Sequence, residues 1–161
     1  VVAISPDDIW WPTLSISLSC PLQVVEGGEQ RAHSVLSALV ALSERVDNDP
    51  WVLVHDAARP CLREEDIDRM LDQLSQHDVD TVDRRNLWRA ATPQMFHLRQ
   101  LSLALGQALT QKLPVTDEAS AIELVGLKPI MVEGHSDNIK ITLPQDLALA
   151  SWFLQQQRGQ A

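Results

Sequence analysis

A histidine, a carboxylate and a guanidinium follow directly on the four apolar residues 51–54, in the segment HDAAR (55–59). Open α/β sheets bind ligands outside the carboxyl ends of their strands, where such a group would lie. Asp56 suits magnesium, which takes oxygen ligands, and Arg59 offers a bidentate fork for phosphate. The small side chain of Ala57 leaves room for a ligand. An ordinary strand end with a turn, in which Asp56 binds a backbone amide, accounts for the same segment equally well.

Three further groups of polar residues allow the same two interpretations. EGGEQRAHS (26–34) is a diglycine before a helix, whose first amides either hold a ligand or simply complete a strand–turn–helix. TVDRRN (81–86), with TPQ (92–94) after it, is either a solvated surface or an arm that reaches a phosphate. In EGHSDNIKIT (133–142), Lys140 lies in a predicted strand and faces either solvent or a ligand.

Taken together, the four groups indicate transfer chemistry at a phosphate. They offer one carboxylate for a metal, two or three cations for phosphates and small residues that leave space. Such a reaction depends on positioning and charge neutralisation more than on a nucleophilic side chain. We interpret His55 as structural and not catalytic.

The composition narrows the class of protein. At 161 residues and 45% hydrophobic, the chain suits one domain, residues 1–161, with a real core. The net charge of −9 argues against a nucleic-acid surface. We find no apolar stretch for a membrane and no secretory leader. Cys20 and Cys61 fit no metal spacing and indicate a reducing cytoplasm.

Hydrophobic periodicity predicts the elements that position these groups. The predicted strands are 1–5, 22–25, 51–54, 129–133 and 138–142. The first predicted helix begins at residue 29. The next three cover 64–75, 98–112 and 117–125, and the last begins at 142. Thr116 or Asp117 would cap the helix at 117, and Thr142 would open a capping box for the last helix. Strands that alternate with helices predict an α/β domain with a largely parallel sheet.

The ordered segments VEGGEQRAHSVLSAL, VLVHDAARPC, TVDRRNLWRAATPQMF, TDEASAIE and VEGHSDNIKIT resemble the 2-C-methyl-D-erythritol 4-phosphate cytidylyltransferase family of the non-mevalonate isoprenoid pathway. The resemblance runs in order from residue 1 to about 153, and HDAARP and DNIK are its specific motifs. It implies a Rossmann-like nucleotidyltransferase and a homodimer joined by projecting β-arms, here about 78–97. The implied reaction joins CTP and methylerythritol phosphate, with Mg2+, and releases pyrophosphate.

The resemblance also implies roles for individual residues. Asp56 would face magnesium and the phosphates, with Ala57 beside it in the substrate site. Arg84 and Lys140 would be catalytic, because they would position the methylerythritol phosphate for attack. The residues lining the cytidine side would be Gly27, Gly28 and Ser34. Those holding the second substrate would be Arg59, Thr92 and Thr116. From the arm, Arg84 and Thr92 would reach the partner subunit's site.

The chain departs from the family pattern in several places. The family's first strand, its glycine-rich loop and the lysine after it, which clamp the triphosphate, are not in this sequence. The first half of the arm, expected between Val79 and Thr81, is also absent. DRRN replaces DRNG, and Glu29 stands where aspartate is common. We expect that segments of an enzyme are missing here. The alternatives are a pentitol-phosphate cytidylyltransferase and an inactive dimeric binding subunit.

Overall fold

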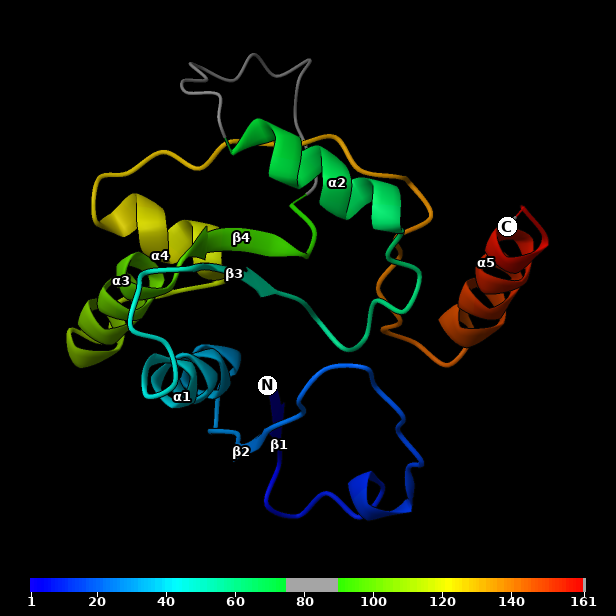
Figure 1. The fold of residues 1–161 in the computed structure, drawn as a ribbon, viewed down its shortest axis with the longest axis horizontal. Coiled ribbons are helices and arrows are strands. Elements are labelled where there is room, and N and C mark those ends of the chain that lie inside the picture. The colour runs from blue at the N-terminus through cyan, green and yellow to red at the C-terminus, as the bar shows by residue number, and fades with distance from the viewer. Residues whose placement is uncertain (75–89, 161) are drawn as a thin grey trace. The chain divides into compact units, whose positions relative to one another are not determined.

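The structure, a computed structural model, describes residues 1–74 and 90–160 and has an α/β fold, as predicted (Figure 1). Its strands are β1 (Val2–Ile4), β2 (Val24–Glu26), β3 (Trp51–Val54) and β4 (Gln94–His97). Its helices are α1 (Arg31–Ser43), α2 (Glu64–Gln73), α3 (Leu98–Thr110), α4 (Glu118–Leu124) and α5 (Asp146–Gln160), with a 3-10 turn at Trp11–Thr13. The elements pair as β1 with β2 and as β3 with β4.

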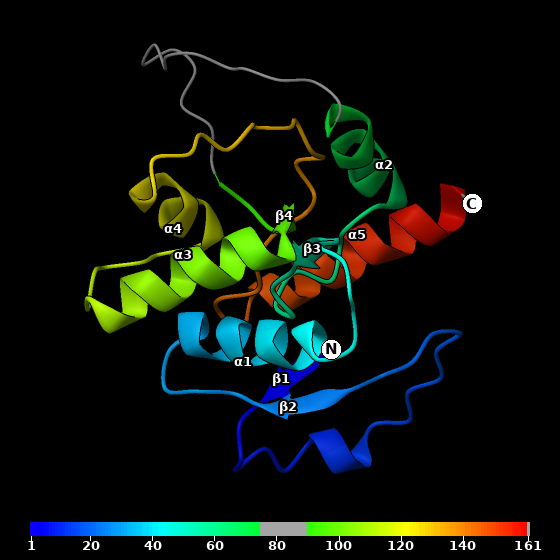
Figure 2. The ribbon, with the colours of Figure 1, turned by 60° about the vertical axis from the view of Figure 1, so that its left-hand side comes forward.

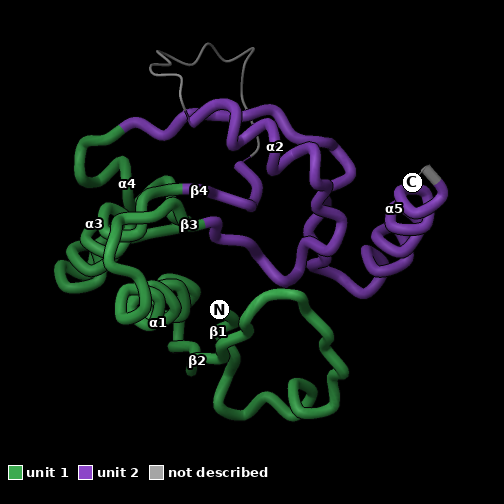
Figure 3. The backbone as a smooth tube through the Cα atoms, viewed as in Figure 1, with its two compact units in different colours: residues 1–52, 96–127 green, residues 53–95, 128–161 purple. Residues whose placement is uncertain are grey.

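Two compact units divide the chain (Figure 3). Unit 1 comprises Val1–Val52 and Phe96–Leu127, and unit 2 comprises Leu53–Met95 and Lys128–Ala161. The boundary falls inside both β3 and β4, so this strand pair has one end in each unit. The prediction of one domain over the whole chain stays a prediction.

Unit 1 is built on α1, which lies between the strands β1 and β2 on one side and α3 on the other (Figure 2). The pair β1–β2 is parallel, with Val2 opposite Val24 and Ile4 opposite Glu26. The helix α3 also packs against α4. Apolar residues recur at helical spacing along α3, and this face forms the core of the unit. Its buried residues are Leu98, Leu101, Ala104, Leu105 and Ala108.

Unit 2 has a smaller core, centred on the turn before α2. Cys61 is fully buried, and its thiol donates a hydrogen bond to the Ala150 carbonyl of α5, with an Sγ to oxygen distance of 3.6 Å. Gln157 of α5 donates to the Cys61 carbonyl at 3.2 Å. Burial, together with the charge of Asp137, raises the pKa of the Cys61 thiol. These contacts attach α5 to the segment that follows β3.

Two predicted strands, 129–133 and 138–142, are wrong: both segments are irregular. Their apolar residues suit a strand, but a strand also needs a neighbour for its backbone groups. Side chains take those groups instead. The His135 amide donates to the Asp66 carboxylate at 3.0 Å, and the Asn138 carbonyl accepts from Arg59 at 2.8 Å. One isolated backbone bond links Ile141 to the Ala58 carbonyl.

The predicted start of the last helix is also wrong, because α5 begins at Asp146. The Asp146 carboxylate accepts the amides of Thr142 and Leu143 at 2.9 and 2.8 Å. Hydrogen bonds from Leu143 and Thr142 lower the pKa of Asp146. The side chain that binds backbone amides at this helix start is therefore that of Asp146, and not that of Thr142. Helical spacing also predicts that Leu71 of α2 faces inward, but this side chain is half exposed.

The two candidate caps of α4 are resolved in favour of Asp117, whose carboxylate accepts the Ser120 amide at 2.9 Å. The Ser120 side chain reaches back to the Asp117 amide, which completes a capping box. Gly126, with a φ of +83°, ends the helix, as predicted. Within residues 1–74 and 90–160, no helix is long and apolar enough to cross a membrane.

Candidate active site

Several predicted site residues meet in unit 2, in what we call the Asp56 cluster: Asp56, Arg59, Thr92, Asn138 and Lys140. Asp56 and Arg59 follow β3, as predicted, and the other members come from two segments distant in sequence. The Lys140 ammonium lies 3.0 Å from Oδ2 of Asp56, and Nε of Arg59 lies 4.0 Å from the same oxygen. The structure thus brings the HDAAR and DNIK motifs together.

Asn138 holds this cluster in place and was not among the predicted site residues. Its carbonyl accepts a hydrogen bond from Arg59, and its side-chain amide donates to the Thr92 carbonyl, both at 2.8 Å. The Thr92 hydroxyl in turn accepts the Asp56 amide at 3.1 Å. The sequence pattern predicts Asn138 only as the polar entrance to the strand 138–142. Its place inside the specific motif DNIK was the signal that could have identified it.

Burial changes the interpretation of two cluster members. Thr92 is 5% exposed and its hydroxyl accepts the Asp56 amide of its own chain, while its reach into a partner's site stays a prediction. Arg59 is 9% exposed and donates one arm of its guanidinium to Asn138, so its fork is partly occupied. His55 donates from Nε2 to the Arg59 carbonyl at 2.9 Å, which agrees with our structural interpretation.

Lys140 is the accessible cation of the group. Its side chain is 43% exposed, against 15% for Asp56 and 10% for Arg59. Its ammonium contacts the Asp56 carboxylate while the side chain stays exposed to solvent, so both interpretations of Lys140 agree with the structure. Ala57 is exposed beside Asp56, and its small side chain leaves space at the surface there. One carboxylate between two cations gives a locally positive site, which attracts anions such as phosphates.

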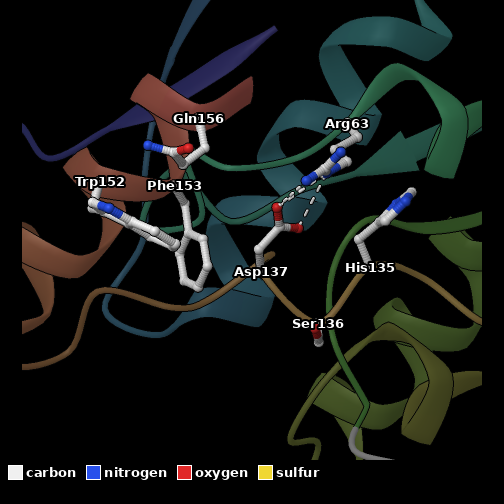
Figure 4. A pocket seen from close by; sticks show the side chains of 7 residues that line it. All are labelled: Arg63, His135, Ser136, Asp137, Trp152, Phe153 and Gln156. Carbon is white, nitrogen blue, oxygen red and sulfur yellow. Dashed lines mark hydrogen bonds and ion pairs between the residues drawn. The ribbon is translucent and has the colours of Figure 1, made fainter. Parts of the chain in front are cut away.

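A pocket of about 320 Å³ flanks the segment that carries Asn138 and Lys140 (Figure 4). Its lining comprises Arg63, His135, Ser136, Asp137, Trp152, Phe153 and Gln156. Arg63 donates from Nε to Oδ2 of Asp137 at 3.0 Å, and Gln157 donates to the same oxygen at 3.2 Å. Burial opposes the charge of Asp137, but bonds from Arg63 and Gln157 outweigh it and lower the pKa of this carboxyl. Asp137 therefore anchors the segment as an anion.

The segment is anchored a second time at His135, two residues before Asp137. Asp66 of α2 is 5% exposed, and its Oδ1 accepts from both the amide and Nδ1 of His135, at 3.0 and 2.9 Å. Gly134 also lies beside Asp66, where an added Cβ would be in ordinary van der Waals contact with Oδ1. The two anchors fix the backbone on the N-terminal side of Asn138.

Unit 1 contains the predicted cytidine-side residues, which we call the glycine turn: Gly27, Gly28 and Ser34. The Gly28 amide donates to the Ser34 hydroxyl at 3.1 Å. A Cβ on Gly28 would lie 2.3 Å from Cβ of His33, and one on Gly27 would lie 3.2 Å from the Ile4 carbonyl oxygen. The contact with His33 therefore requires a glycine at position 28, and the approach to Ile4 makes position 27 tight, whether or not a ligand approaches them.

The remaining predicted residues are separate from these groups. Thr116 is exposed in unit 1, just before α4, and its amide donates to the Ser120 hydroxyl at 3.1 Å. Arg59 and Thr92, its predicted companions at the second substrate, belong to unit 2. Arg84 lies outside the described residues.

Comparison with known proteins identifies the family. The sequence pattern of the family described as IspD, 2-C-methyl-D-erythritol 4-phosphate cytidylyltransferase, matches residues 1–79 and 76–156. The chain belongs to this family. A relative of that name from Vibrio atlanticus (strain LGP32) is 45% identical over 179 residues, covering 98% of this chain and 76% of the relative. One from Hahella chejuensis is 45% identical over 173 residues, covering 94% of this chain and 72% of the relative.

Solved structures of the cytidylyltransferase family share the fold. The Francisella tularensis enzyme has a TM-score of 0.79 at 37% identity, covering 94% of this chain and 78% of its own. That from Thermus thermophilus has a TM-score of 0.76 at 28% identity, covering 95% and 80%. The alignment to the Vibrio atlanticus relative, at 179 residues, is longer than the 161 residues of this cytidylyltransferase-family chain. That relative therefore has positions that this chain lacks.

The donor set of the Asp56 cluster fits magnesium only in company with a phosphate. Among the residues that the structure describes, no three His, Cys, Asp or Glu side chains gather to hold an ion. Asp56 supplies one partly accessible carboxylate. Magnesium in nucleotide-using enzymes of this kind keeps several waters and binds one or two carboxylates plus substrate phosphates. A single carboxylate is therefore sufficient for a cation that arrives with the nucleotide.

The anchoring anion Asp137 leads to a prediction about acid stability. Because the folded-state pKa of Asp137 lies below its ordinary value of 3.8, the unfolded chain takes up the proton first as the pH falls. The stabilisation is present above 3.8 and is lost as the pH falls through the folded-state pKa. We expect Asp137→Asn to remove this part of the pH dependence. Urea unfolding between neutral and acid pH measures it.

The control for this experiment is Ser136→Ala, an uncharged and exposed neighbour in the same segment. This variant should keep the acid sensitivity of the wild type. An Asp137→Asn variant with the wild-type slope would show that the anchor does not depend on this anion.

Proposed function

We propose that this chain catalyses the reaction of its family. It joins CTP and 2-C-methyl-D-erythritol 4-phosphate to give 4-diphosphocytidyl-2-C-methyl-D-erythritol and pyrophosphate, in isoprenoid precursor biosynthesis. The observation that carries the proposal is the Asp56 cluster, which joins the family's HDAAR and DNIK motifs through the 3.0 Å contact of Lys140 with Asp56. Relatives that bear the family name are 45% identical over nearly the whole chain.

The reaction needs no nucleophile from the protein. An oxygen of the methylerythritol phosphate attacks the α-phosphorus of CTP, a phosphorus–oxygen bond forms, and the bond to the pyrophosphate oxygen breaks. Negative charge grows around the α-phosphorus in the transition state, and a fixed cation beside it lowers the barrier. Lys140 is that cation in the described residues of unit 2. Arg84, outside the described residues, is assigned a similar task by the family motif.

The other assignments follow the family motifs and the local contacts. The glycine turn binds the cytidine, with Ser34 already oriented by the Gly28 amide. Thr116, exposed before α4, binds the second substrate. Arg59 and Thr92 act mainly by supporting Asp56, because both are buried and hydrogen-bonded within the cluster. Ala57 leaves space next to the carboxylate.

Magnesium is the proposed cofactor, and Asp56 is its protein ligand. When bound with the nucleotide, the ion neutralises charge on the phosphates. The Asp56 side chain is 15% exposed and contacts Lys140, and the Asp56 backbone amide donates a hydrogen bond to the Thr92 hydroxyl. The carboxylate is therefore oriented before a nucleotide arrives. The cytoplasm is the proposed location, because the exposed Cys20 and the buried Cys61 are both free thiols.

The test of this function compares two acceptors with CTP and magnesium. Purified protein should release pyrophosphate with methylerythritol phosphate and should react far less with a pentitol phosphate such as ribitol 5-phosphate. The reverse preference would assign the chain to the pentitol enzymes. If neither acceptor reacts while CTP binds, the chain is a binding subunit and the proposed reaction is wrong.

Two substitutions separate the roles within the Lys140–Asp56 pair. Lys140→Met keeps the packing of the stem, and the loss of one exposed ion pair costs about 1 kcal/mol or less of stability. Turnover should fall roughly a hundred- to thousand-fold, because the cation acts in the transition state. Asp56→Asn should also lose turnover, and excess magnesium should not restore it. Steady-state kinetics and thermal unfolding measure both.

The matched control is Lys128→Met, which removes another exposed lysine of unit 2 and should leave turnover unchanged. Ordinary turnover in Lys140→Met would show that the DNIK lysine has no part in the chemistry. In Asp56→Asn, a rate that recovers fully with added magnesium would show that the carboxylate only raises the affinity for the ion and is not needed for turnover itself.

A homodimer is the proposed assembly, since the family resemblance implies an arm, predicted at about 78–97, across a two-fold interface. Within that range Gln94–His97 form β4, paired with β3 of the same chain, and residues 78–89 lie outside the described residues. Light scattering at micromolar concentration should therefore give twice the mass of the chain. A monomer that retains full turnover would show that the arm and Arg84 are not needed from a partner.

A further inference from the structure

We infer that the ion pair between Arg31 and Glu118 is a positioning device that holds two substrate-binding segments of unit 1 at a fixed separation. This inference rests on the proposed function, because that proposal assigns the cytidine to the glycine turn and the second substrate to Thr116. Neither Arg31 nor Glu118 has a role in the proposed chemistry. The pair lies within one compact unit, between α1 and α4.

The geometry of the pair is that of a bidentate fork. Both terminal nitrogens of Arg31 donate to Glu118, one to each carboxylate oxygen, and the Nη2 to Oε2 distance is 2.8 Å. Glu118 is completely buried, while the Arg31 side chain is 33% exposed. Paired parallel bonds fix the orientation of both groups as well as their distance. A buried carboxylate cannot exchange this partner for water.

Each residue of the pair begins a helix next to a substrate-binding segment. Arg31 is the first residue of α1, and the glycine turn leads into it. Glu118 is the first residue of α4 and follows Thr116 and the cap Asp117. Short bonds attach each segment to its helix: Gly28 to Ser34 on one side, and Thr116 to Ser120 on the other. The fork thus connects the start of the cytidine side to the start of the second-substrate side.

Local helix energetics do not explain the position of Arg31. A helix N-terminus favours acids and disfavours cations, and the first turn of α1 contains no acid to compensate. Nor does stability alone require the pair, because well-packed apolar residues often replace a buried ion pair without loss. The helices α1 and α4 both pack on α3, whose buried residues are all apolar, and apolar packing sets no direction by itself. Directional placement is what the fork adds.

The experiment compares Arg31→Met, Glu118→Leu and the double variant, in the full chain, by thermal unfolding and by kinetics with both substrates. Each single variant leaves one partner unsatisfied and should unfold at a lower temperature. The double variant should regain the wild-type melting temperature. Its kcat/KM should stay about a hundred-fold low, with raised KM for both substrates, because misplacement by about 1 Å has that effect. Joint recovery of stability and kinetics would show that the pair is only structural.

Arg31→Lys provides a second variant that keeps the charge but cannot form the fork. It should fold, and its kcat/KM should fall about ten-fold, a smaller loss than that from removing the side chain. Arg99→Met is the matched control, since Arg99 is an arginine of unit 1 that binds the Asp47 carbonyl and no predicted substrate residue. It should retain wild-type kinetics. A folded Arg31→Lys protein with wild-type KM values would overturn the inference.

Hydrogen exchange gives a readout that does not depend on turnover. In Arg31→Met, the amides of Gly28 and Thr116 should both exchange faster, and in Arg99→Met neither should. A change confined to one segment would overturn the coupling of the two. If the wild type makes no product from CTP and methylerythritol phosphate, the proposed reaction fails, and exchange still decides whether the pair links the segments.

Discussion

The Asp56 cluster depends on the hydrogen bonds of one residue, Asn138. Its carbonyl and its side-chain amide bind two segments that are 79 and 46 residues away, those of Arg59 and Thr92. Thr92 then fixes the amide of Asp56. Because the segment around Asn138 forms no strand, these side-chain bonds replace the ladder that would otherwise hold it. The bonds of Asn138, with that of the Ile141 amide to the Ala58 carbonyl, hold the backbone on both sides of Lys140, which contacts Asp56.

This arrangement makes the Asp56 cluster locally positive, although the chain as a whole is negative. The protein carries a net charge of −9, yet Asp56 lies between Lys140 and Arg59. Acidic side chains elsewhere satisfy backbone amides that no sheet or helix bond reaches. These are Asp8, Asp49, Asp66, Asp117 and Asp146. The acidity of the sequence is thus partly structural, and it does not argue against an anionic substrate.

Elements with a purely local signal could be predicted from the sequence. Strand β3 was predicted with its observed bounds, and α3 to within two residues at its end, because apolar spacing fixes both. The family could be recognised because HDAAR and DNIK are short and specific. Strands at 129–133 and 138–142 could not be excluded, since their composition is that of a strand and only the absence of a ladder neighbour among the described residues prevents one.

Contacts between segments distant in sequence also explain why some site residues were predicted and others were missed. Asp56 and Lys140 carry charges in recognisable motifs, whereas the roles of Asn138 and Glu118 depend on partners 46 to 87 residues away. No spacing rule within a segment reports such a contact. The glycine turn shows the converse, because its glycines have a sufficient reason in Cβ contacts with His33 and the Ile4 carbonyl. A turn shaped by its own chain is preorganised for the cytidine that we propose it binds, and preorganisation lowers the entropy cost of binding. Structural necessity and substrate binding are therefore compatible explanations of the same residues.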